Sequence, residues 1–134
     1  MLRSKDYDFS FSGLKTEVRR YVEKEKPSEE MKKRIALGVE EAITEVLTEK
    51  SVRAAEEFGA STIILGGGVS ANTRMRERLA IRMTQEGGGL LLAPTPDLAT
   101  DNAIMIALAG YFHAQKKEFA DVETLKANGN LKLA

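Results

Sequence analysis

The first third of the chain alternates apolar and polar positions with helical spacing. Apolar residues that recur every three to four positions predict a short amphipathic helix over residues 13–25. Ser10 or Ser12 is expected to cap its start, since serine hydroxyls accept hydrogen bonds from free helix N–H groups. Pro27 should end this helix, because proline cannot continue the hydrogen-bond ladder.

A second helical pattern follows, and it is unusually long for a small domain. Ser28 stands where an N-cap belongs, and the apolar positions from Met31 onward keep to one face. Gly59 is a suitable stop signal, so the helix is predicted to run to Phe58. A break near residues 49–51 is the alternative.

Two short apolar runs, STIIL at 61–65 and LLLAP at 90–94, have the length of buried strands. A third helix is predicted between them, with Ser70 as its cap and the glycines at 87–89 as its end. Residues 100–113 are apolar on nearly all sides, which is typical of a helix buried on more than one side.

The order of these elements predicts the fold class. Strand, helix, strand, helix at the end of the chain indicates an α/β protein that is rich in helix and has a short parallel sheet. Two parallel strands are too few for an independent sheet, because parallel sheets are covered on both faces and normally have more strands. The pattern therefore suggests that a part of the fold is missing from this chain.

Composition narrows the function classes. The 134 residues suffice for one domain, and 20 Lys and Arg balance 20 Asp and Glu, so binding of nucleic acid by charge alone is disfavoured. There is no cysteine, and His113 is the one histidine, which excludes a thiolate site or a histidine cage within this chain. No apolar run approaches the roughly 20 residues that span a bilayer, and the polar start does not resemble a signal peptide. A cytoplasmic location is expected.

The segment ILGGGVSAN carries the main candidate site. Gly66, Gly67 and Gly68 join a strand to a helix, where backbone can approach a ligand and the helix N-terminus favours an anion. The spacing fits neither a P-loop nor G-x-G-x-x-G, so a turn needed only for packing stays open. Asn72 would bond a ribose, a base or a phosphate, or else its own backbone.

Asp101 follows the second strand, in the first turn of the apolar helix. Because the carboxyl ends of parallel strands meet at one edge, it is expected near the glycine turn, as a metal or phosphate-side ligand. The alternative is that this carboxylate only stabilises the helix by interacting with the positive end of its dipole. Arginines on the third helix would contact RNA phosphates or form a solvated face: Arg74, Arg76, Arg78 and Arg82.

Three segments in this order, DFSFSGLKT, ILGGGVSANTRMRERL and TDNAIMIALAG, resemble the C-terminal half of the bacterial tRNA N6-adenosine threonylcarbamoyltransferases, the TsaD family, formerly called glycoproteases. The resemblance implies that residues 1–134 form the C-terminal lobe portion of an actin-like ATPase (ribonuclease H-like) fold, without the N-terminal lobe. It implies that the glycine turn and Asn72 bind an adenine nucleotide (ATP, ADP or threonylcarbamoyl adenylate). Asp101 would be one ligand of iron or zinc, whose histidine ligands belong to the missing half.

The resemblance also implies a reaction. The family transfers the threonylcarbamoyl group of threonylcarbamoyl adenylate to N6 of the adenosine next to the anticodon of tRNA. This chain would be inactive alone and would need the N-terminal lobe and the partner proteins of the threonylcarbamoylation complex. The alternative is a non-catalytic nucleotide-binding or protein-interaction module that self-associates through exposed apolar surface. Peptidase activity is disfavoured, since Ser70 has no histidine base in a recognisable motif.

Overall fold

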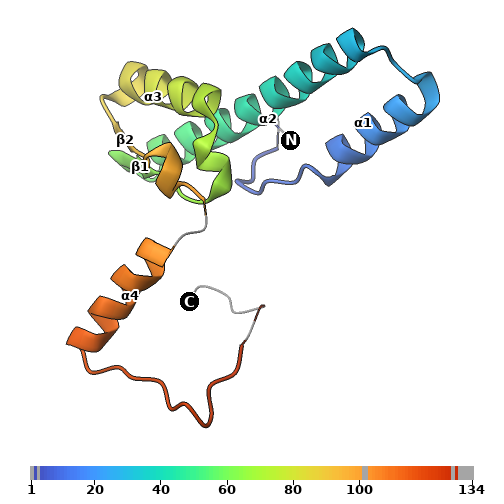
Figure 1. The fold of residues 1–134 in the computed structure, drawn as a ribbon. Coiled ribbons are helices and arrows are strands. Elements are labelled where there is room, and N and C mark those ends of the chain that lie inside the picture. The colour runs from blue at the N-terminus through green and yellow to red at the C-terminus, as the bar shows by residue number, and fades with distance from the viewer. Residues whose placement is uncertain (1, 3, 101–102, 128, 130–134) are drawn as a thin grey trace. The chain divides into compact units, whose positions relative to one another are not determined.

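The structure, a computed structural model, describes residues 2, 4–100, 103–127 and 129 (Figure 1). It divides into two compact units, Met1–Thr100 and Asp101–Ala134. The elements follow the order α1 (Ser12–Glu25), α2 (Glu29–Glu57), β1 (Thr62–Ile64), the 3-10 turn η1 (Gly68–Ala71), α3 (Thr73–Gly87), β2 (Leu90–Leu92), the 3-10 turn η2 (Pro96–Leu98) and α4 (Ala103–Gln115).

Helix α1 has the predicted extent but not the predicted cap. Phe11 is the N-cap residue and no side chain caps the helix. The hydroxyls of Ser10 and Ser12 instead lie 3.2 Å apart and bond each other, so the predicted serine cap is wrong. The helix ends at Glu25, followed by the C-cap residue Lys26 in a left-handed conformation (φ 43°) and then by Pro27, as predicted.

Helix α2 confirms the longer of the two predictions. The Ser28 hydroxyl accepts a hydrogen bond from the Met31 N–H at 3.3 Å, which is the predicted N-cap. The helix continues through residues 49–51 without a break. Gly59 follows its end with a positive φ of 63°, a conformation that favours glycine.

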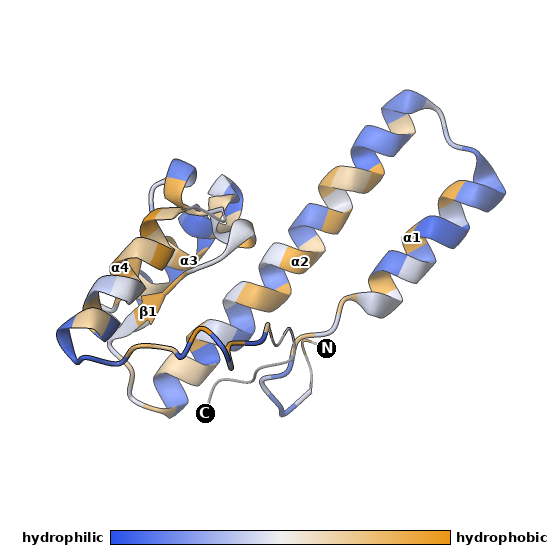
Figure 2. Cartoon of the chain, turned by 60° about the horizontal axis from the view of Figure 1, so that its bottom comes forward, coloured by the Kyte–Doolittle hydropathy of each residue, from blue (hydrophilic) through white to orange (hydrophobic). Residues whose placement is uncertain are grey.

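The sheet is parallel, with Thr62 opposite Leu90 and Ile64 opposite Leu92. Helix α3 connects the two strands and packs on α2. The buried core lies between these helices and is formed by Val52, Ala55, Met75, Leu79 and Met83, with Leu47, Ile63, Leu65 and Leu91 packed against it. Figure 2 shows hydrophobic colouring on β1, and Ile64 of this strand is 76% exposed. In the first unit, one side of the sheet is therefore covered and the other is open.

Helix α4 confirms the predicted helix in the second unit, with Ala103 as its first residue. We predicted a buried helix, but no described residue of α4 is buried in the second unit. The reason is that this unit contains no other helix or strand among its described residues to pack against it. None of the helices that the structure describes has the length and apolar character needed to cross a membrane.

Candidate functional site

The glycine turn begins where β1 ends. Gly67 has φ 77° and ψ 174°, a combination that essentially only glycine adopts. A Cβ atom added at Gly66 or Gly68 would meet nothing within 4 Å among the described residues. The positive φ therefore explains the glycine at position 67, and at all three positions the main chain faces open space in which a ligand can approach it.

The Asn72 side chain hydrogen-bonds both α3 and α2. Its Oδ1 accepts a hydrogen bond from the Met75 N–H at 2.8 Å, and its Nδ2 donates one to Glu40 Oε1 at 2.7 Å. Asn72 is thus the N-cap of α3, and the side chain also ties the turn to α2. An amide has two N–H donors and two acceptor lone pairs, so each end keeps capacity for one more bond. Bonding to a ligand stays a prediction.

The predicted cap Ser70 is wrong. The four-residue turn η1 separates β1 from α3, so the helix begins at Thr73, beyond the reach of a cap at Ser70. Ser70 is 1% exposed and its hydroxyl has no partner among the described residues. Its carbonyl accepts a hydrogen bond from Arg76 Nε, which fixes the turn against the first turns of α3.

A groove with a volume of about 890 Å³ runs beside the glycine turn. Its walls come from α1, α2 and η1, and its apolar lining includes Val18, Val22, Ile35, Val39, Ile43 and Val69. Gly68 and Asn72 lie on its wall, together with Glu40, and two lysines of α2 also line it. An apolar groove of this size with a few polar groups at one side suits a flat organic ring that carries hydrogen-bonding atoms.

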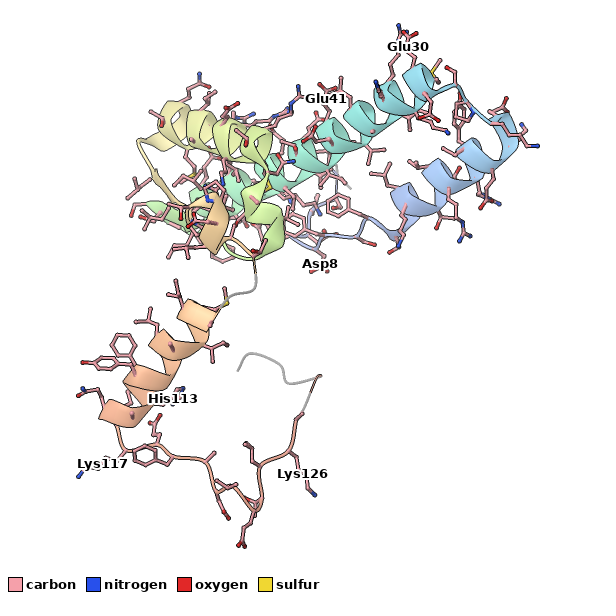
Figure 3. The ribbon with its side chains drawn as sticks, in the orientation of Figure 1. Asp8, Glu30, Glu41, His113, Lys117 and Lys126 are labelled. Carbon is pink, nitrogen blue, oxygen red and sulfur yellow. The ribbon has the colours of Figure 1, made fainter. Side chains whose placement is uncertain are left out.

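The arginines of α3 contact the chain itself. Arg74 pairs with Glu41 of α2 at 3.0 Å, and Arg82 pairs with Glu49 of α2. Figure 3 labels Glu41, the α2 partner of Arg74 in this pair. Arg76 also bonds the carbonyl of Ser70 in the turn. The arginine face of α3, expected to be solvated, is therefore partly a contact surface with α2 and the turn. Binding of RNA phosphates by this face stays a prediction.

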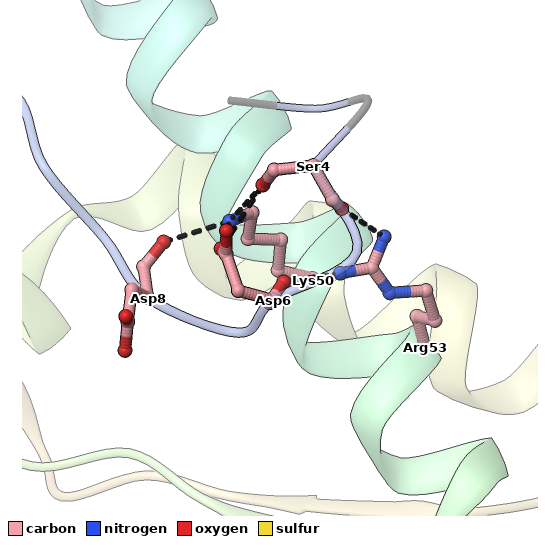
Figure 4. Close-up of polar contacts among 5 residues, drawn as sticks. All are labelled: Ser4, Asp6, Asp8, Lys50 and Arg53. Carbon is pink, nitrogen blue, oxygen red and sulfur yellow. Dashed lines mark hydrogen bonds and ion pairs between the residues drawn. The ribbon is translucent and has the colours of Figure 1, made fainter.

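A buried lysine is the feature that sequence reasoning missed. The Lys50 side chain is 1% exposed, and its ammonium donates to Ser4 Oγ at 2.9 Å, Asp6 Oδ1 at 2.6 Å and the Asp8 carbonyl at 2.7 Å (Figure 4). Arg53 donates to the Ser4 carbonyl at 3.1 Å and the Asp6 carbonyl at 2.5 Å. The Lys50 hydrogen bond, helped by the Ser4 hydroxyl, lowers the pKa of Asp6 below its usual value.

One signal for Lys50 was present in the sequence. It follows Val46 and Leu47 by four and three positions, so it occupies the apolar face of α2 where a hydrophobic residue is expected. A lysine at such a position needs acceptors, because a buried ammonium without partners is very unfavourable. The acceptors lie more than 40 residues away in the sequence, so no local pattern identifies them.

The described residues do not form a metal site. Asp101 lies outside the described residues, so its expected place near the glycine turn stays a prediction. Within the described ranges, no group of three His, Cys, Asp or Glu residues is arranged to hold a metal ion. His113 of α4 pairs with Glu118 at 2.7 Å in the second unit. A single aspartate falls short of the three protein ligands typical of a catalytic metal.

Comparison with known proteins places the chain in a family. The family profile described as TsaD, tRNA N6-adenosine threonylcarbamoyltransferase, matches residues 1–108. The tRNA N6-adenosine threonylcarbamoyltransferase of Thermosipho africanus is 41% identical over 133 residues, which are 99% of this chain and 40% of the relative. That of Symbiobacterium thermophilum is 47% identical over 108 residues, 79% of this chain and 31% of the relative. The chain thus spans less than half the length of these relatives, and it belongs to the TsaD family.

Proposed function

We propose that this chain forms the nucleotide-binding side of a tRNA-modifying enzyme and binds the adenosine part of an adenine nucleotide in the groove beside the glycine turn. The observation that carries the proposal is that the glycine turn has open space beside its backbone and that its Gly68, together with Asn72, lines the apolar groove. Gly67 gives the turn its shape, and the Asn72 amide keeps spare hydrogen-bonding capacity toward the groove wall. Membership of the TsaD family supports a role in tRNA modification.

The reaction we propose is transfer of the threonylcarbamoyl group from threonylcarbamoyl adenylate to tRNA. The N6 amino group of the adenosine next to the anticodon attacks the carbamoyl carbonyl carbon. The bond from that carbon to the phosphate oxygen breaks, AMP leaves, and the amino group loses one proton. The role of this chain is to hold the adenylate through Gly66, Gly67, Gly68 and Asn72, so that the reacting carbonyl lies at the edge of the groove.

The remaining catalytic groups belong, in this proposal, to an N-terminal lobe of the same enzyme. The two lobes would complete an actin-like ATPase fold, of which the helix-rich α/β arrangement here is one part. Asp101 would contribute one ligand to iron or zinc, and because the described residues supply no others, we assign no step to the metal. The chain alone is therefore expected to be inactive and to act with partner proteins and tRNA, in the cytoplasm.

A non-catalytic binding module is the second candidate. The open side of the sheet favours it, since Ile64, Leu90 and Leu92 are 76%, 55% and 46% exposed. Apolar surface of this kind marks a protein contact, including contact with a second copy. Addition of an N-terminal half from a TsaD relative separates the candidates, because recovery of threonylcarbamoyl transfer supports the enzyme fragment and persistent inactivity supports the module.

An amide NMR titration of the full chain with AMP tests the proposed site. We expect chemical shift changes at residues 66–72 and at the groove residues Val18 and Val39. Gly68→Leu should abolish them by placing a side chain at the wall of the groove, whereas Gly129→Leu, a matched change in the second unit, should leave them intact. Inorganic phosphate tests for a simple anion site. A well-dispersed spectrum without changes at residues 66–72 at millimolar AMP would contradict the proposal.

A further inference from the structure

The α1 wall of the groove is not fixed by core packing. Val18 and Val22 of α1 line the groove, yet α1 has no buried residue. The opposite wall differs, because its α2 residue Thr44 is buried and α2 carries further buried residues beyond the groove. The placement of α1 along the groove must therefore depend largely on how its two ends are held.

The segment before α1 is tightly held on α2, and we name residues 4–8 the N-terminal strap. The Lys50 ammonium bonds its first, third and fifth residues, and Arg53 bonds two of its carbonyls (Figure 4). The ring of Tyr7 lies 5.6 Å from that of Phe58, with the Arg53 guanidinium 5.3 Å from the Tyr7 centroid. Polar and aromatic contacts thus attach the strap to the second half of α2.

The strap limits where α1 begins. Asp8 and Ser12 are four residues apart, so at most about 14 Å of extended chain separates the held carbonyl from the start of the helix. Release of the strap would break the three hydrogen bonds of the Lys50 ammonium, which is 1% exposed while the strap is bound, and the two that Arg53 donates. Because hydrogen bonds that involve a charged group are stronger than neutral ones, these five bonds favour the held state of the strap.

We propose that Lys50 is a positioning residue that fixes α1 as a wall of the adenosine groove, acting through the N-terminal strap. Lys50 lies six positions beyond the groove residue Thr44, about 9 Å further along α2, so it acts without touching the ligand. The consequence for binding rests on the proposed nucleotide function. The consequence for the position of α1 does not.

The test compares Lys50→Met with Arg82→Met in the full chain. Lys50→Met removes a cation that pairs with Asp6 of the strap. Arg82→Met removes a cation of α3 that pairs with Glu49, the residue before Lys50 on α2. The chain has no cysteine, so spin labels can be placed at Glu17→Cys of α1 and Arg34→Cys of α2. Pulsed electron–electron double resonance then gives the α1–α2 distance distribution, and a titration with AMP gives the affinity.

We expect Lys50→Met to broaden the distance distribution and to raise the Kd for AMP about tenfold, if the binding-competent position of α1 falls to about a tenth of the population. Arg82→Met should change neither. An unchanged distribution in Lys50→Met would overturn the proposal, as would a broadened one with unchanged AMP affinity. If the parent chain does not bind AMP, the proposed function fails, and the distance distribution alone decides the role of Lys50.

A second pair of variants guards against misfolding of Lys50→Met. Asp6→Ala changes only the strap and removes one acceptor, whereas Asp6→Asn keeps an oxygen that can accept the Lys50 hydrogen bond. We expect Asp6→Ala to broaden the α1–α2 distances and Asp6→Asn to restore the parent distribution. Equal distributions in Asp6→Ala and the parent chain would refute the role of the strap.

Discussion

Replacement of Asn72 by alanine should destabilise the first unit through two separable losses. The change removes the N-cap bond to the Met75 N–H and the bond to the Glu40 carboxylate. Loss of an N-cap side chain typically costs about 1 kcal/mol. A hydrogen bond to a charged group contributes about 1.5–3 kcal/mol, and we take roughly 1 kcal/mol here because both side chains are only half-buried. The expected loss is about 2 kcal/mol.

Asn72→Asp separates the two contributions. Aspartate caps a helix as well as asparagine does, so the bond to the Met75 N–H should survive. The new carboxylate then faces Glu40 without a donor between them, and like charges at this distance repel. Adding Glu40→Gln should recover stability, because the glutamine amide can donate to the introduced carboxylate in place of the original bond.

The assay is urea unfolding followed by circular dichroism, with the parent chain, Asn72→Asp, Glu40→Gln and the double variant arranged as a double-mutant cycle. The slope of the transition should stay constant while the midpoint moves. A free energy of unfolding for Asn72→Ala within about 0.5 kcal/mol of the parent chain would refute the double role of Asn72. Additivity of the Asn72→Asp and Glu40→Gln effects would show that the two side chains do not interact.

Two further predictions concern the turn and the strap. Gly67→Ala should cost about 1–3 kcal/mol in urea unfolding because of its φ of 77°, whereas Gly66→Ala should stay within about 0.5 kcal/mol, and equal costs would contradict this reasoning. The Lys50 hydrogen bond lowers the pKa of Asp6 below its ordinary value of 3.8. The ionised Asp6 therefore stabilises the folded chain above pH 3.8, and this stabilisation is lost as the pH falls through the lowered pKa. Urea midpoints measured at decreasing pH should therefore fall less steeply in Asp6→Asn than in the parent chain, and parallel curves would contradict the assignment.

Elements bounded by strong local signals were predictable from the sequence. Ser28 and Gly59 delimit α2 because a cap hydroxyl and a positive φ act within one turn of helix. The start of α3 was predicted wrongly, since a four-residue 3-10 turn placed the cap at Asn72 instead of Ser70. Both residue types cap helices, so the sequence alone could not distinguish them.

The groove and the strap were beyond local pattern reasoning. The sequence identified the glycine turn, whose conformational demand is local, but not the α1 and α2 walls beside it. Lys50 illustrates the limit, because a lysine on an apolar face shows that acceptors are needed without showing where they are. Its acceptors on Asp6 and Asp8 lie more than 40 positions away, and only the folded chain brings them to the lysine.

The two walls of the groove should respond differently to a ligand. The α2 wall and the glycine turn are joined to each other by the Asn72–Glu40 bond and to the core through α3, whose Leu79 is 1% exposed. The α1 wall lacks buried residues, so a ligand that contacts Val18 and Val22 must also bear the cost of ordering that helix. Interactions that pre-order α1, such as those of the strap, reduce this cost before binding. Affinity for a nucleotide should therefore depend on residues that never touch it.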